Sequence, residues 1–97
     1  MYARLTIVHL RPDKLAEATQ IFAESVIPAA KQQKGFISLH LLTDQTSGKG
    51  IAVGFWESEA DAITNEQGGY YQEQVGKFKD WMTAPPVREG YEVGASS

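Results

Sequence analysis

The two histidines are the only side chains in this sequence whose charge ordinarily changes near neutral pH, so they are the first candidates for acid–base chemistry. His40 shares the parity of Phe36, Ser38 and Leu42 in an extended run, which predicts that its imidazole lies on a buried sheet face. There it is either a general base toward an acidic phenol or a neutral core histidine bonded to a hydroxyl or a backbone group. His9 is expected at the rim of the fold. No carboxylate stands at ligand spacing from either histidine, so we expect no metal site.

Trp56 ends the apolar run Ile51–Trp56 and is the next candidate. Its indole ring either lines an aromatic-binding cavity and donates its N–H to a substrate oxygen, or fills space beneath a helix. Ala52 and Gly54 lie on the same predicted face of the strand and leave room for the ring in both cases.

Further candidates surround the paired glycines at 68–69, which predict a hinge or the mouth of a ligand site. Tyr70 and Tyr71 follow the glycines, so one hydroxyl is expected to face a pocket, or both tyrosines are packed only. Asn65 precedes them and either hydrogen-bonds a substrate carbonyl or caps the helix. Phe78 lies on the same helical stripe as Tyr71 and is expected in the core.

The elements that must position these residues follow from periodicity and from turn residues. Strands are expected at 2–10, 36–42, 51–56 and 87–93. The first helix is expected to start at Asp13 as N-cap and to be interrupted near Pro28. The second starts with a capping box at Ser58 and Asp61, breaks at the paired glycines and resumes as a second piece. The stripe of that second piece consists of Tyr71, Val75, Phe78 and Met82.

The resulting order is βαββαβ in one domain over residues 1–97, with an ordered core at about 2–93. This order is typical of the α+β ferredoxin-like fold, in which a four-stranded antiparallel sheet carries both helices on one face.

Both faces of the predicted sheet are mostly apolar, although helices cover only one of them. The simplest cover for the second face is another copy of the sheet, which predicts a homodimer with roughly 600–800 Å² buried per subunit. The alternative is a monomer with a semi-apolar sheet face.

The composition restricts the possible binding partners and the expected cellular location. The net charge of −3 with scattered basic residues argues against nucleic acid and anionic membranes as partners. No cysteine is present, which excludes disulfides and thiolate chemistry and fits a reducing cytoplasm. We therefore expect a cytoplasmic protein.

The element order, the segment KGFISLHLL and the junction GFWESEADA resemble the dimeric α/β-barrel superfamily and, within it, antibiotic biosynthesis monooxygenase (ABM) domains. The resemblance spans about residues 2–93, and its most specific part is Trp56 followed by Ser58 and the pair Glu59-Ala60. It implies barrel-like dimers with a cavity between sheet and helices in each subunit. Some members oxidise polycyclic aromatic substrates with O₂ and neither metal nor flavin, others degrade haem, and many have no assigned activity.

The chain departs from the family pattern at several positions. Many members carry a glutamate where Gly54 stands, and a histidine where this chain has Asn65 and Glu66. The haem-degrading branch carries an asparagine on the first strand, in the region of Leu5 and Thr6, which argues against haem degradation here.

The sequence therefore leaves two hypotheses for the function. The first is a cofactor-independent monooxygenase acting on a small aromatic or quinol-like molecule. The second is a non-catalytic, ligand-binding or stress-associated dimeric barrel. For the enzyme, the expected catalytic residues are His40 and Trp56. The expected substrate-binding residues are Thr6, Asn65, Tyr70, Tyr71 and Phe78.

Overall fold

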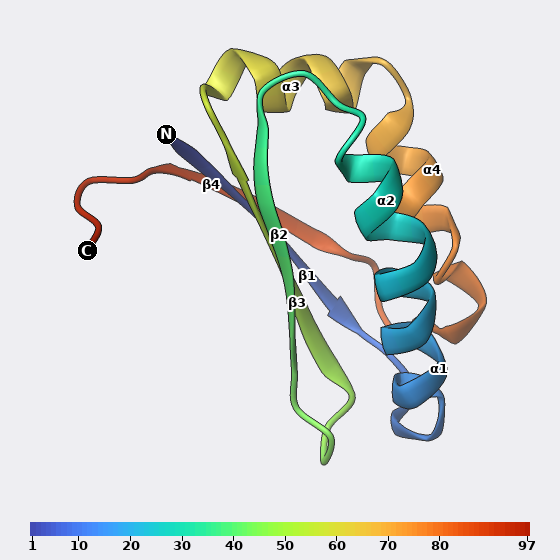
Figure 1. Cartoon of the computed structure of the whole chain (residues 1–97). Helices are drawn as coiled ribbons and strands as arrows, with labels where there is room; N and C mark the ends of the chain where they lie inside the picture. Colours follow the sequence, from blue (N-terminus) through green and yellow to red (C-terminus); the bar gives the residue numbers. More distant parts are fainter.

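Four antiparallel strands form one sheet in the computed structural model, which describes all 97 residues (Figure 1). The strands lie side by side in the order β2-β3-β1-β4, so the two central strands are β1 and β3. This arrangement confirms the ferredoxin-like βαββαβ expectation. The strands are β1 (Tyr2–His9), β2 (Phe36–Thr43), β3 (Lys49–Trp56) and β4 (Val87–Glu92).

The helices all lie on one side of the sheet (Figure 1). The first helical region follows β1, and the second connects β3 to β4. None of the helices is long and apolar enough to cross a membrane. The helices are α1 (Leu15–Ile21), α2 (Ile27–Ala30), α3 (Glu59–Gln67) and α4 (Tyr70–Gly76), with a π-helical segment at Phe22–Val26 and 3₁₀ turns at Pro12–Lys14 and Lys79–Trp81.

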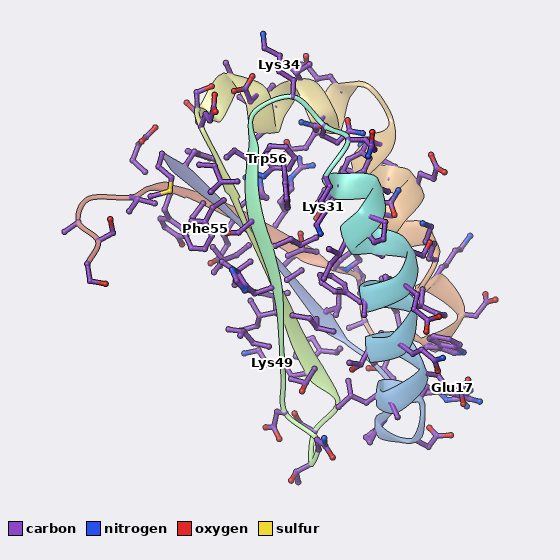
Figure 2. The ribbon with its side chains drawn as sticks, in the orientation of Figure 1. Glu17, Lys31, Lys34, Lys49, Phe55 and Trp56 are labelled. Carbon is purple, nitrogen blue, oxygen red and sulfur yellow. The ribbon has the colours of Figure 1, made fainter.

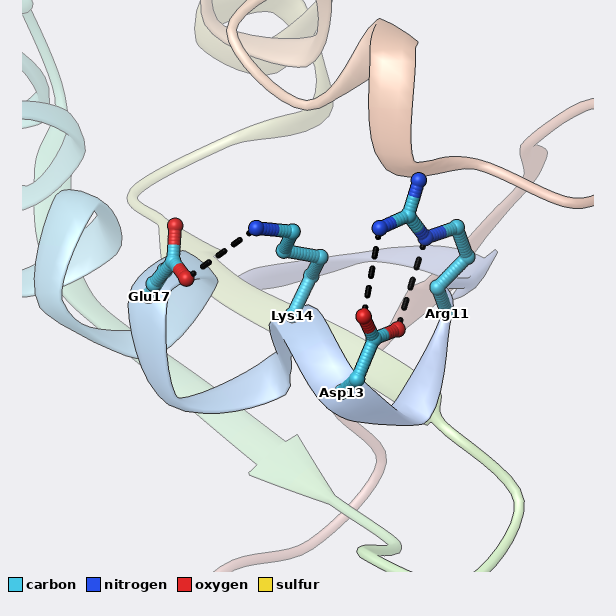
Figure 3. Close-up of polar contacts among 4 residues, drawn as sticks. All are labelled: Arg11, Asp13, Lys14 and Glu17. Carbon is cyan, nitrogen blue, oxygen red and sulfur yellow. Dashed lines mark hydrogen bonds and ion pairs between the residues drawn. The ribbon is translucent and has the colours of Figure 1, made fainter.

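The start of α1 differs from the expected cap. Asp13 lies inside the preceding 3₁₀ turn, where its carboxylate accepts from Arg11 Nη2 at 3.2 Å (Figure 3). The residue at the N-cap is Lys14, which makes no capping hydrogen bond but reaches Glu17 at 3.3 Å. Because Arg11 holds the carboxylate of Asp13, that side chain does not cap the helix, and the Asp13 expectation was wrong.

The helix predicted to kink or end near Pro28 does not end there, because its backbone stays in the αR region through Val26 and Ile27 as far as Ala30. The regular α-helix gives way to π-helical geometry over Phe22–Val26, and Pro28 then lies in the first turn of α2. Pro28 lacks the N–H that a helix interior needs, and the change of hydrogen-bond register in the π-helical segment just before it accommodates this loss within a continuous helix.

The expected capping box at the start of α3 is also present. The backbone N–H of Asp61 donates to Ser58 Oγ at 3.2 Å. The helix ends before the paired glycines, and Gly69 has a φ of 85°, a left-handed conformation that glycine adopts without strain. The second piece is shorter than its apolar stripe suggested, because α4 ends at Gly76.

The buried core forms two clusters between the sheet and the helices. One contains Tyr2, Trp56 and Ala62, and the other contains Leu10 and its neighbours at the start of α1. Alternation along β3 produces this placement, because Trp56 points toward the helices whereas Phe55 points away from them (Figure 2).

A β-bulge between Phe36 and Ser38 changes the expected parity of β2. Phe36 faces the helices together with Leu39 and Leu41, whereas His40 lies on the other face with its ring edge against Phe55 at 6.2 Å between centroids. The side chain of His40 is exposed in the chain, so its expected position on a buried face is corrected.

No element of the chain covers the face of the sheet opposite the helices (Figure 1). We call it the open face. The cross-strand partners Ala3, Phe55 and Tyr91 lie on it, as do Ile7, Ile51 and Val87 four residues along each strand. Leu42, Val87 and Tyr91 are each more than half exposed.

Candidate functional site

A cavity of about 110 Å³ lies between the sheet and the helices. Its floor is formed by alternate residues of the two central strands, among them Thr6 from β1 and Ala52 and Gly54 from β3. The helices contribute the roof, which includes Phe22. Of the 20 lining residues 16 are hydrophobic, so the site suits an apolar ligand with few polar anchors.

Trp56 provides one such anchor at the wall of the cavity. Its ring stacks edge-on against Phe36 at 5.7 Å between centroids and an angle of 79°. The indole Nε1 makes no hydrogen bond within the chain, and the lack of a side chain at Gly54 keeps the space beside it open. A Cβ at Gly54 would lie 3.3 Å from Nε1. The expectation that Ala52 and Gly54 leave room for the ring is confirmed, and the ring lines the cavity.

Thr6 and Tyr71 form a second polar anchor. The two hydroxyl oxygens lie 2.6 Å apart and connect the floor strand β1 to α4. Burial raises the pKa of Tyr71, and the hydrogen bond from Thr6 opposes that shift in part. Burial also raises the pKa of Tyr70 to about 12. Both phenols are therefore neutral at physiological pH, where they donate or accept hydrogen bonds but do not act as anionic bases.

A charged cluster closes the cavity beside this anchor. Arg4 lines the cavity and contacts Glu66 of α3 in an ion pair whose side chains are only 14% and 11% exposed. The contact is an ion pair without a well-aligned hydrogen bond. Arg88 lies 3.5 Å from the second oxygen of Glu66, with its guanidinium 5.1 Å from the ring centre of Tyr71. Two cations therefore share one carboxylate.

Gly90 makes room for this cluster on the neighbouring strand. It pairs with Arg4 across β1 and β4, and a Cβ there would overlap the Tyr2 hydroxyl and the Arg4 guanidinium. The glycine thus permits a buried guanidinium on the helix side of the sheet.

Most residues expected from the sequence are brought together at the cavity. Its lining includes Thr6, Trp56, Tyr70, Tyr71 and Phe78. They come from the strands β1 and β3, from α4 and from the turn that follows it.

Two expected site residues do not line the cavity. Asn65 is 7% exposed, and its side-chain amide donates to the carbonyl oxygen of Asp61 at 2.8 Å, a contact within α3. His40 lies on the open face, on the far side of the sheet from the cavity. No aspartate, glutamate or histidine lines the cavity.

Arg4 and Gln74 are lining residues that the sequence interpretation missed. Arg4 has the parity of Thr6 in an otherwise apolar strand, which was the available signal for an inward charge. Gln74 follows Tyr70 by four residues and is only 8% exposed. It accepts a hydrogen bond from Lys77, which also donates to Ser25 and so connects α4 to the first helical region. Nowhere in the chain do three or more histidine, aspartate or glutamate side chains gather closely enough to hold a metal ion.

This fold and cavity define a ferredoxin-like α+β protein of the dimeric α/β-barrel class. Residues 1–84 match the family "Antibiotic biosynthesis monooxygenase" (ABM), and the chain belongs to this family. The resemblance noted from the sequence is thereby confirmed.

Solved structures share the fold across nearly the whole chain. Rv0793 from Mycobacterium tuberculosis superimposes with a TM-score of 0.76 at 14% identity, covering 99% of this chain and 97% of that one. The ActVA-Orf6 monooxygenase of Streptomyces coelicolor, solved with nanaomycin D, has a TM-score of 0.78 at 12% identity, covering 99% and 89%. SnoaB from Streptomyces nogalater, a cofactor-independent oxygenase, has a TM-score of 0.76 at 13% identity, covering 98% and 94%.

At these identities the similarities establish the fold alone. Among curated proteins, none matches this sequence.

Proposed function

We propose that this protein is a cofactor-independent monooxygenase of the ABM type that acts on a small aromatic or quinol-like molecule. The observation that carries the proposal is the unpaired indole N–H of Trp56 at the wall of a mostly apolar cavity. A planar apolar ligand with one oxygen acceptor satisfies both properties of that wall. The relatives support the same ligand class, since one is a cofactor-independent oxygenase and another was solved with nanaomycin D.

The reaction balances with O₂ and substrate alone. In an anthrone, for example, a ring CH₂ becomes a carbonyl group. One oxygen atom becomes that carbonyl oxygen and the other leaves as water with the two hydrogens, so the substrate supplies all of the electrons. The protein must then favour the electron-rich anion of the substrate and keep it in a fixed orientation.

Arg4 and the neutral anchors are suited to these tasks. The guanidinium of Arg4 at the cavity wall favours an anionic over a neutral substrate in a site of low polarity. The Trp56 N–H donates to the substrate oxygen, and the pair of Thr6 and Tyr71 provides a further polar contact elsewhere on the cavity wall. Because no side-chain carboxylate or imidazole lines the cavity, the proton leaves to water. This proposal gives His40 no role in the cavity.

Oxygen uptake with a hydroxylated anthrone tests the proposal. We expect Trp56→Phe to lower the enzymatic rate about tenfold, the effect of one lost hydrogen bond in a dry site. Trp81→Phe is the matched control, because Trp81 does not line the cavity, and it should keep the rate. A wild-type rate equal to the uncatalysed oxidation, or equal rates for wild type and Trp56→Phe, would contradict the assignment.

The lack of an ionisable base at the cavity favours a second candidate function, that of a ligand-binding protein without turnover. The same experiment separates the two functions. If an aromatic ligand binds with an affinity that depends on Trp56 but no oxygen is consumed, the protein is a ligand-binding protein and not an enzyme.

The proposal includes a homodimer through the open face and a cytoplasmic setting. The exposed apolar side chains of that face support the dimer, since a monomer would leave them in water. The absence of cysteine supports the proposed cytoplasmic location.

A further inference from the structure

A second hollow lies next to the cavity, between α4 and the chain that leads into β4. It is more open to solvent, and it shares Tyr71, Val75 and Met82 with the cavity wall. The ring of Tyr71 separates the two spaces, with the cavity on one side and the guanidinium of Arg88 on the other. The hollow therefore lies directly beyond the part of the cavity wall that Tyr71, Val75 and Met82 form.

The hollow is cationic. Lys79 and Arg88 line it, and neither aspartate nor glutamate does. Lys79 forms no ion pair in the chain. Arg88 shares the carboxylate of Glu66 with Arg4, so that carboxylate cannot neutralise both guanidinium groups.

This local excess of positive charge runs against the net charge of the chain, which is −3. Basic side chains are otherwise scattered, and here three of them follow one path from the cavity wall to the surface. Such a path attracts an anionic group and not a neutral one.

The size of the cavity also indicates that a ligand extends beyond it. An apolar cavity of about 150 Å³ holds one benzene ring in another protein. The 110 Å³ found here therefore encloses about one ring, so a polycyclic ligand such as an anthrone or a naphthylamine extends beyond it. The adjacent cationic hollow, beyond Tyr71 and Val75, offers space for the rest of a larger ligand.

We propose that the natural ligand is an aromatic acid, whose ring lies in the cavity and whose carboxylate or equivalent anionic group lies in the hollow on Lys79 and Arg88. This inference rests on the proposed function, because it requires an aromatic molecule in the cavity. It adds an acidic substituent to the ligand class and assigns a second subsite to hold it.

A pair of fluorescent probes tests the acidic group separately from the aromatic ring. Anilinonaphthalene sulfonate carries an anion, and phenylnaphthylamine has the same ring system without it. We expect the double variant Lys79→Gln/Arg88→Gln to bind the sulfonate about tenfold more weakly, as the loss of two favourable charge contacts predicts. Binding of the neutral amine should change less than about twofold. Lys79→Gln alone should show about a threefold loss for the sulfonate, and it removes no contact of the fold.

Two controls make the result specific. Lys49→Gln removes one charge at the far end of the β2–β3 hairpin (Figure 2) and should leave both affinities unchanged. Val75→Phe places a larger side chain between the cavity and the hollow and should weaken the binding of both probes.

The outcomes separate this inference from the proposed function. If Val75→Phe weakens both probes while the lysine and arginine variants affect neither, or affect both probes equally, the acidic subsite is wrong and the aromatic site stands. If Val75→Phe affects neither probe, no ligand enters the cavity, and both proposals are overturned.

Discussion

The hydroxyl oxygens of Thr6 and Tyr71 lie 2.6 Å apart and join the central strand β1 to α4 across the wall of the cavity. Residues separated by 65 positions in the chain thereby hold the roof of the site against its floor. Because α4 follows a glycine pair and ends after two turns, this contact is one of few polar links that orient it.

Tyr71→Phe should destabilise the protein by about 1–2 kcal/mol, because it leaves the buried hydroxyl of Thr6 without a partner. Urea unfolding measures the change. The double variant Thr6→Val/Tyr71→Phe should recover most of the loss, since it removes both polar groups and keeps their shape. A double variant no more stable than the single one would show that the hydroxyl pair is not the cause.

Glu66→Gln should cost about 3 kcal/mol of unfolding free energy, since the buried guanidinium of Arg4 would lose its counter-charge. Thermal or urea unfolding measures this cost. Glu73→Gln changes an exposed glutamate in the first turn of α4 and should cost far less. Equal effects of the two substitutions would contradict the role assigned to the Arg4–Glu66 pair.

Stability should fall as the pH rises from about 10 to 12, in part through Tyr70. Its pKa is about 12 in the folded protein, above the ordinary value of 10, because the phenol is buried. Below pH 10 the group is protonated in both states and its contribution is complete. Between the two values the unfolded chain ionises while the folded protein keeps the proton, so ionisation favours unfolding.

Ultraviolet titration of wild type and Tyr70→Phe isolates this group. The difference between the two curves should have its midpoint near pH 12. A midpoint near pH 10 would show that Tyr70 is solvated.

Gly54→Ala should lower the affinity for phenylnaphthylamine several-fold, because the added Cβ would stand 3.3 Å from Trp56 Nε1 and 3.5 Å from Leu39 Cδ1. Fluorescence titration measures the affinity. Gly94→Ala is the matched control, since no atom lies within 4 Å of its added Cβ and it lines neither the cavity nor the hollow. Unchanged affinity in Gly54→Ala would place the ligand away from the indole.

The open face predicts a concentration-dependent dimer. Sedimentation velocity at micromolar concentration should show a dimer for wild type and a monomer for Leu42→Glu, which puts a charge on the exposed apolar face. Ala23→Glu adds the same charge on the exposed side of the first helical region and should remain dimeric. A wild-type monomer under these conditions would rule out the proposed interface.

Part of the fold is determined by local patterns in the sequence. The alternation along β3 sends Trp56 toward the helices and Phe55 away from them, because successive side chains of a strand point to opposite faces. The Ser58 cap and the glycine pair at 68–69 set the ends of α3 for equally local reasons. The stripe that includes Tyr71 and Phe78 likewise predicted which side of this region lines the cavity.

Other features exist only in three dimensions. The bulge in β2 reverses the parity of the residues before it, and hence only the paired strands reveal that Phe36 and His40 face opposite sides. Asp13 had two possible partners nearby, and the contact with Arg11 prevailed over the helix cap.

The charged cluster of Arg4, Glu66 and Arg88 shows most clearly what depends on tertiary structure and what does not. Arg4 and Arg88 become neighbours because β1 pairs with β4, and Glu66 reaches both from the helix layer above. The sequence by itself determined the order of the elements and the inward face of β3, since those depend on neighbouring residues. Only the tertiary structure decided which distant charges share one carboxylate beside the cavity, because that depends on strand order and helix packing.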